Sequence, residues 1–187
     1  LEGCSATLVG PGSGRRANTV VTAWHCLEHY RDLSRPILFT LSLPGSEELR
    51  IEALRVADGG GMHADWAILR LREPVDAVTA LSIHPGDAAP GDGVTMAGYS
   101  RDSGLGKGGR HLTFDATCHV TARSSGSADT DCSAYKGASG GAVIQVSASG
   151  TAYYSGVISA GDSAGLSRYV PVQVFRSALM TQLLQPL

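Results

Sequence analysis

Short segments rich in Val, Ile, Leu and Thr recur along most of the chain, and Gly, Pro, Asp and Ser separate them. This pattern is typical of an all-β sandwich or barrel. The segments are 6–9, 19–23, 37–43, 49–56, 66–70, 94–98, 142–146 and 152–159. Only residues 172–184 predict a helix, because apolar side chains recur there at three- and four-residue spacing.

The densest cluster of Gly, Pro and Asp lies near the middle of the chain, at residues 83–93. Such a cluster marks a connection between two folded units. We therefore expect an N-terminal β unit over 1–88 and a C-terminal β unit with the helix over 89–187.

Composition restricts the classes of partner. Charged residues are 17% of the chain and the net charge is -2, so no electrostatic attraction to nucleic acid or to an anionic membrane is expected. No apolar stretch approaches the roughly 18 residues of a membrane span. The 13 arginines against two lysines suggest a bacterial gene.

Four cysteines fall two in each half of the chain and form no Cys-x-x-Cys pair. Zinc binding would need paired spacings, and a catalytic cysteine would leave an odd number to pair. The simplest interpretation is two local disulfides, Cys4–Cys26 and Cys118–Cys132. Disulfides persist in oxidising compartments, so we expect a secreted or periplasmic protein.

The sequence Gly-Ala-Ser-Gly-Gly at 137–141 is the strongest local motif. Glycines beside a serine let the backbone turn sharply and let a substrate carbonyl approach the amide groups. Taken alone, the motif fits a nucleophilic Ser139, the nucleophile elbow of an α/β-hydrolase, or an ordinary Gly-Ser loop.

The order of residues along the chain separates these alternatives. In α/β-hydrolases the histidine follows the serine, whereas all six histidines here precede Ser139. A subtilisin-like order needs an aspartate before the histidine, and none precedes His25. The order His, Asp, Ser remains available.

His25 follows the apolar run 19–23 and precedes Cys26, whose disulfide would fix the loop that presents the imidazole. Asp65 precedes the apolar run 66–69, where a buried carboxylate needs a partner such as His25. These contexts predict a catalytic triad of His25, Asp65 and Ser139.

Three segments resemble the signature blocks of chymotrypsin-like serine proteases: 22–26 (Thr-Ala-Trp-His-Cys), 65–69 (Asp-Trp-Ala-Ile-Leu) and 137–143 (Gly-Ala-Ser-Gly-Gly-Ala-Val). The resemblance extends to 3–9 and 157–161, which are similar to the strand with the first half-cystine and the strand beside the substrate cleft. The spacing of Cys132 before Ser139 is closer to the bacterial trypsin-like and glutamyl-endopeptidase-like branches.

The resemblance implies two six-stranded antiparallel β-barrels with the triad in the cleft between them. His25 would act as general base and acid, and Asp65 would orient the imidazole. The amide groups of Gly137 and Ser139 would form the oxyanion hole. No cofactor and no metal are implied.

The resemblance also implies substrate contacts. Ser133 would form the floor of the primary specificity pocket, and Ser159, Ala160 and Gly161 would line the substrate backbone. A serine floor predicts a neutral pocket, but Asp131, Asp162 or Lys136 could change that preference. A glutamate preference is less expected, because no histidine stands before Ser159.

Two departures from the family bear on activation. Ala138 stands where the family has the aspartate that receives a new N-terminus, so that switch cannot operate. By this resemblance, the beginning of the first barrel is missing, so either upstream residues have been cut away or this branch closes the barrel differently. An open strand edge would be a liability.

Two other functions remain open. His25-Cys-Leu-Glu28-His29 matches the zinc motif His-x-x-Glu-His. The double barrel could also be a catalytically inactive binding protein. For the protease, we expect a monomer that acts on protein or peptide substrates and has a proteinaceous inhibitor as a further partner.

Overall fold

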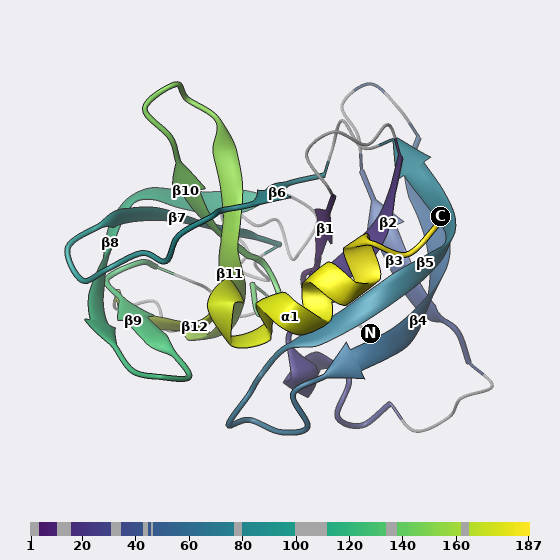
Figure 1. The fold of residues 1–187 in the computed structure, drawn as a ribbon, viewed down its shortest axis with the longest axis horizontal. Helices are drawn as coiled ribbons and strands as arrows, with labels where there is room; N and C mark the ends of the chain where they lie inside the picture. The colour runs from purple at the N-terminus through teal and green to yellow at the C-terminus, as the bar shows by residue number, and fades with distance from the viewer. Residues whose placement is uncertain are drawn as a thin grey trace.

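The computed structural model of the protein describes residues 4–10, 16–30, 35–42, 45, 47–76, 80–99, 112–133, 138–161 and 165–187. Two β-sheets lie side by side, and one helix crosses from one to the other (Figure 1). The all-β prediction is confirmed.

The first sheet is antiparallel, with the order β1-β2-β5-β4-β3. Its strands are β1 (Thr7–Val9), β2 (Arg16–Thr22), β3 (Ile37–Leu41), β4 (Leu49–Asp58) and β5 (Ala67–Asp76). β2 is almost wholly buried because Val20 packs in the interior of the first sheet while Val21 packs in the core shared with the second sheet. Among the described residues, β1 and β3 form the two ends of the sheet and do not pair with each other.

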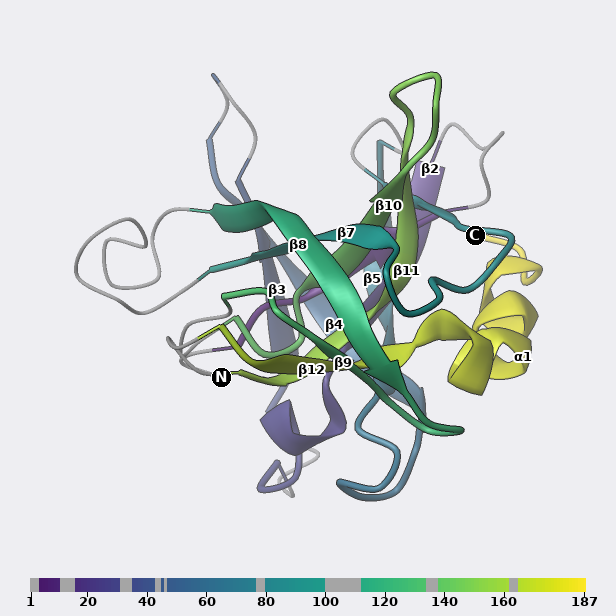
Figure 2. The ribbon, with the colours of Figure 1, turned by 90° about the vertical axis from the view of Figure 1, so that its left-hand side faces the viewer.

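The second sheet has the order β10-β7-β8-β9-β12-β11-β6, and a further β10–β11 pairing closes six of its strands into a barrel. Figure 2 views this sheet with β8 nearest the viewer. Its strands are β6 (Ser82–Ile83), β7 (Gly93–Gly98), β8 (Thr113–Arg123), β9 (Ala128–Thr130), β10 (Ala142–Val146), β11 (Ala152–Gly161) and β12 (Ser167–Pro171). β6 is added outside the ring, parallel to β11.

The architecture is that of a chymotrypsin-like double barrel with one difference from expectation. Two six-stranded barrels were predicted, whereas the described residues form one closed six-stranded barrel and one five-stranded half-barrel. The physical reason is that no described strand bridges β1 and β3. The unit boundary near residue 88 stays a prediction.

The predicted C-terminal helix is confirmed as α1 (Val172–Leu183). It begins directly after β12, at Pro171, whose fixed φ suits a helix start. Phe175 of α1 stacks on Trp66 of the first sheet with ring centroids 5.3 Å apart. Within the described chain, no helix is long and apolar enough to cross a membrane.

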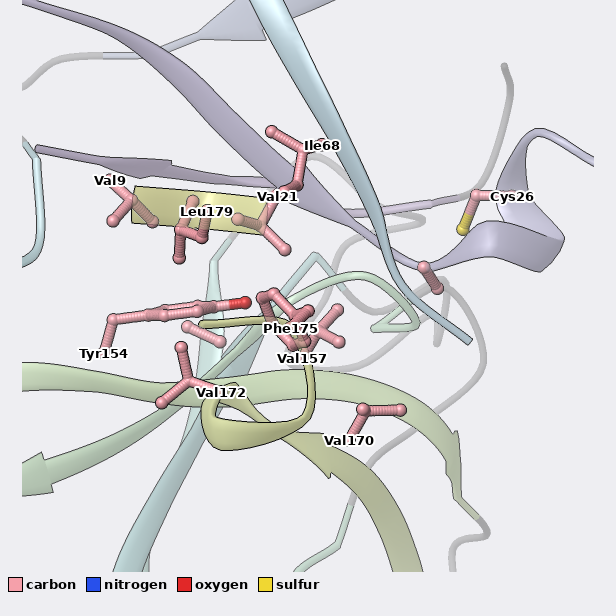
Figure 3. Packing of buried hydrophobic residues seen from close by; sticks show 12 residues of the cluster. Val9, Val21, Cys26, Ile68, Tyr154, Val157, Val170, Val172, Phe175 and Leu179 are labelled. Carbon is pink, nitrogen blue, oxygen red and sulfur yellow. The ribbon is translucent and has the colours of Figure 1, made fainter. Parts of the chain in front are cut away.

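A hydrophobic core lies between the two sheets, separate from the interior of each (Figure 3). Its fully buried members come from both sheets and from α1: Val9, Val21, Ala23, Ile68, Tyr154, Val157, Val172 and Leu179. Burying such side chains stabilises a fold by about 1.5–3 kcal/mol each. This shared core therefore holds the two sheets in one fixed arrangement.

Both predicted disulfides are present. Cys4–Cys26 joins the chain before β1 to the turn after β2, and Cys118–Cys132 joins β8 to the segment after β9. One disulfide therefore lies in the first sheet and the other in the second.

Candidate active site

His25 lies on the three-residue 3-10 helix Trp24–Cys26, which turns the chain directly after β2. The neighbouring Cys26 is bonded to Cys4, so the position of the turn is fixed covalently. The His25 side chain is 26% exposed, which leaves one edge of the imidazole open to solvent or substrate.

Asp65 lies just before β5, in a turn closed by a hydrogen bond from Gly59 N–H to the Trp66 carbonyl. Its side chain is 1% exposed. Three donors satisfy the buried carboxylate. His25 Nδ1 lies 2.7 Å and Ser159 Oγ 2.5 Å from Oδ2, and the His25 backbone N–H donates to Oδ1 at 2.8 Å.

These bonds set the charges of the pair. Burial alone would raise the pKa of Asp65, but the hydrogen bonds from His25 and Ser159 outweigh burial and hold it below its usual value. The hydrogen bond to Asp65 raises the pKa of His25 above 6.5, against the opposing effect of burial. An ionised carboxylate only accepts, so Nδ1 carries the proton and Nε2 of neutral His25 has a free lone pair.

Ser139 lies in the tight turn that leads into β10, where Gly141 N–H donates to the Ala138 carbonyl. The next residue, Gly140, has φ +86°, a conformation that other residues rarely adopt. A Cβ at Gly140 would also lie 2.1 Å from the Ser5 carbonyl oxygen. Glycine is therefore required beside the serine, as the motif predicted.

Ser159 connects the serine to the aspartate. Its carbonyl oxygen accepts the Ser139 hydroxyl at 3.4 Å, while its own hydroxyl donates to Asp65. Between the described residues Ser139 and His25 there is no hydrogen bond. The structure thus brings His25 and Asp65 into direct contact and links Ser139 to them through Ser159.

The other predicted site residues are partly described. Ala160 and Gly161 lie at the exposed end of β11, beside a cavity of about 280 Å³. The Ser133 backbone N–H donates to the Asp115 carboxylate at 2.9 Å. Lys136 and Gly137 lie outside the described residues, as does Asp162.

Two contacts near Ser133, the predicted floor of the specificity pocket, were not predicted from the sequence. Asp115 supplies a carboxylate next to Ser133, and hydrogen bonds led by that of Ser133 N–H lower its pKa. Asp131, considered as a pocket residue, instead accepts the His119 backbone N–H at 2.5 Å. No local motif signals either contact, because both join residues on different strands or loops.

The zinc alternative gains no support from the geometry. Among the described residues, the one potential metal group is Cys4, His25 and Cys26, and both cysteines are in the disulfide. His29 is 90% exposed beside Glu28. The His25 segment is a three-residue 3-10 helix, so the one-face spacing of an α-helical zinc motif does not arise.

A closed β-barrel beside a β half-barrel, with a histidine bonded to a buried aspartate near a serine that glycine follows, is the arrangement of the chymotrypsin-like class of peptidases. The chain belongs to the family of the trypsin-like peptidase domain, whose sequence profile matches residues 4–151.

A crystal structure described as the inactive form of the Rv3671c protease has a similar fold. The TM-score is 0.61 with 17% sequence identity, over 96% of this chain and 83% of that chain. At this identity the likeness concerns the fold alone. A comparison with curated proteins finds no match.

Proposed function

We propose that the protein is a serine endopeptidase with His25, Asp65 and Ser139 as its catalytic triad. The observation that carries the proposal is the buried Asp65 carboxylate, which holds both the imidazole of His25 and the hydroxyl of Ser159. Ser159 in turn accepts the hydroxyl of Ser139. A scaffold without catalysis has no physical need for this chain of polar contacts in its interior.

The first half of the reaction forms an acyl-enzyme. His25 Nε2 takes the proton of Ser139 Oγ as that oxygen bonds to the substrate carbonyl carbon. The hydroxyl must rotate away from the Ser159 carbonyl to do so. The peptide C–N bond then breaks, and His25 returns the proton to the leaving amine.

The second half releases the acid product. His25 takes a proton from water, the water oxygen bonds to the acyl carbon, and the Ser139 ester bond breaks with return of that proton. The amides of Gly137 and Ser139 stabilise the oxyanion in both halves. Asp65 stays ionised and stabilises the imidazolium, in line with the directions of both pKa shifts.

For specificity, we propose a neutral primary pocket with Ser133 as its floor. Asp131 is engaged by His119, which supports a floor without that carboxylate. A peptide library scored for the residue before the cut tests this. Cleavage after apolar or aromatic residues supports the proposal, whereas dominant Arg or Lys would implicate Asp115 or Asp162, and dominant Glu would implicate Lys136.

The two disulfides suggest a location outside the cytoplasm. We propose a secreted or periplasmic monomer that cleaves proteins or peptides, needs no cofactor, and is open to a proteinaceous inhibitor. Nucleic acid and membranes are not among the proposed partners.

The decisive experiment is labelling with a fluorophosphonate probe, which reacts with an activated serine. We expect labelling and peptide hydrolysis in the wild type and neither in Ser139→Ala, with unchanged folding by circular dichroism. Ser149→Ala is the matched control, since Ser149 is an exposed serine in a β-turn. A folded wild-type protein that is not labelled would favour the inactive binding protein.

A further inference from the structure

Ser5 lies just before β1 and is only 4% exposed. Its backbone N–H donates to the Ser139 carbonyl at 2.8 Å, and its own carbonyl accepts the Thr22 hydroxyl at 2.9 Å. Its side-chain oxygen accepts the Tyr99 backbone N–H at 2.8 Å. One small residue therefore connects β2 of the first sheet, the end of β7 in the second sheet, and the serine turn.

The residue before Ser5 extends this connection to the histidine. Cys4 is bonded to Cys26, which follows His25 directly. Cys4 and Ser5 are consecutive. The disulfide to the His25 turn and the hydrogen bond to the Ser139 turn are therefore made by neighbouring residues. This segment is therefore linked both to the His25 turn and to the Ser139 turn.

The turn at Ser139 also packs directly on Ser5. A Cβ at Gly140 would lie 2.1 Å from the Ser5 carbonyl oxygen and 2.5 Å from the Thr22 hydroxyl. The backbone of the turn thus rests against Ser5 with no intervening side chain. The location of Ser139 follows the location of Ser5 with little freedom.

We propose that Ser5 is a positioning residue for the reaction described above, and that its hydroxyl keeps the serine turn in register with His25. The inference rests on the proposed function. Without the hydroxyl, the Tyr99 N–H loses its acceptor and the end of β7 relaxes relative to β1. A displacement well under 1 Å at a nucleophile is enough to slow attack several-fold.

The test compares Ser5→Ala with the wild type. We expect kcat and the fluorophosphonate labelling rate to fall by about 3- to 10-fold, with KM unchanged, because only presentation of the nucleophile is altered. The midpoint of the pH profile stays in place, because Asp65 sets the pKa of His25. Ser5→Thr, which keeps the hydroxyl, restores the labelling rate.

Thr113→Val is the matched control. It removes a side-chain hydrogen bond to the Gly98 carbonyl (3.1 Å), one residue before Tyr99, and leaves the bond from Tyr99 N–H to Ser5 in place. We expect it to lower Tm to a similar extent while the labelling rate stays within about twofold. Should Ser5→Ala not fold, Thr22→Val removes the other side-chain bond to Ser5 and is expected to slow labelling in the same way.

The outcomes separate the two proposals. A labelled wild type with an equally fast Ser5→Ala contradicts the role of Ser5 and leaves the protease intact. Equal slowing in Ser5→Ala and Thr113→Val contradicts it as well, because the effect would then be general. A wild type that is not labelled at all overturns the protease and the positioning role together.

Discussion

The two sheets differ in how they hold their part of the site. The second sheet closes on itself through the β10–β11 pairing and carries Ser139 on a turn within that ring. Among the described residues, the first sheet does not close on itself, because β1 and β3 do not pair and the outer edge of β1 pairs with Leu81 instead. This sheet carries His25 and Asp65. His25 and Asp65 therefore lie on the half of the molecule that does not form a closed barrel.

Contacts from outside the half-barrel fix the positions of His25 and Asp65. Ser159 of the closed barrel donates to Asp65, and Phe175 of α1 stacks on Trp66 beside it. The Cys4–Cys26 disulfide fixes the His25 turn. The comparison teaches that a half-barrel can present an ordered His–Asp pair when a neighbouring barrel and a covalent bond supply the missing constraint.

The largest effect is expected from Asp65→Asn. Both carboxylate oxygens accept, Oδ2 from His25 Nδ1 and Ser159 Oγ and Oδ1 from the His25 backbone N–H, whereas an amide accepts at only one of its two atoms. His25 then favours the tautomer with its proton on Nε2, which is not a base toward Ser139. We expect kcat to fall by roughly 10³- to 10⁴-fold without loss of folding.

The control for this variant is Asp58→Asn. Asp58 lies on the same sheet and forms only a partly exposed pair with Arg55, 3.7 Å away. Its kcat is expected to stay within about twofold of the wild type, since such pairs contribute little. Equal activity of Asp65→Asn and Asp58→Asn in a peptide assay would remove Asp65 from the triad.

Removing each disulfide in turn gives the most direct comparison of the half-barrel with the closed barrel. They close loops of similar length, with separations of 22 and 14 residues, so replacing either pair with alanines is expected to cost about 3 kcal/mol of unfolding free energy. Only loss of Cys4–Cys26 should also lower kcat, because it frees the His25 turn. Denaturant titration and kinetics at a temperature where both variants are folded measure the two effects.

That experiment has a clear contrary result. If loss of Cys118–Cys132 lowered kcat as much as loss of Cys4–Cys26, the closed barrel would depend on its disulfide as strongly as the half-barrel does. The proposed difference between the sheets would then be wrong.

The smallest effect is a shift in the pH profile. The pKa of His25 lies above 6.5 because of its hydrogen bond to Asp65, so the neutral base forms only above that pH. We expect kcat/KM to rise through a midpoint above about 6.5, and residual activity of Asp65→Asn to rise at lower pH. A flat profile between about pH 6 and 8 would exclude His25 as the base.

His25 and Asp65 also make the stability of the fold depend on pH, and their contributions change in opposite directions as pH rises. The raised pKa of His25 stabilises the fold at low pH, and this contribution is lost as pH rises through its folded value. The lowered pKa of Asp65 stabilises the fold above about pH 3.8, and this contribution is lost as pH falls through its folded value. The pair therefore stabilises the fold most between these two limits.

Much of the fold could be predicted from local patterns, and the misses have a physical cause. The helix at α1 and the strands β2, β5, β7, β10 and β11 follow from apolar runs. β8 was not predicted because its sequence is mostly polar and only Cys118 and Val120 of its eleven residues are buried. β9 was not predicted because it has only three residues, and β12 (Ser-Arg-Tyr-Val-Pro) was not predicted because only Tyr169 and Val170 form an apolar run before the proline.

In the candidate site too, some features could be predicted from local sequence and others could not. Residue order and local sequence context led to His25, Asp65 and Ser139. The hydrogen bond from Ser159 to Asp65 spans 94 residues, and the one from Tyr99 to Ser5 also spans 94. Serines and backbone amides are too common for their long-range partners to be read from one sequence.

The core between the sheets has a consequence for the time at which activity can arise during synthesis. Val172 and Leu179 complete a cluster that begins with Val9, and Phe175 supports the strand beside Asp65. A nascent chain that ends at residue 161 already contains all three proposed catalytic residues but lacks α1. Such a chain lacks the α1 side chains that complete the core between the two sheets, so under the proposed function we expect peptide cleavage only after α1 has been synthesised and has packed against both sheets.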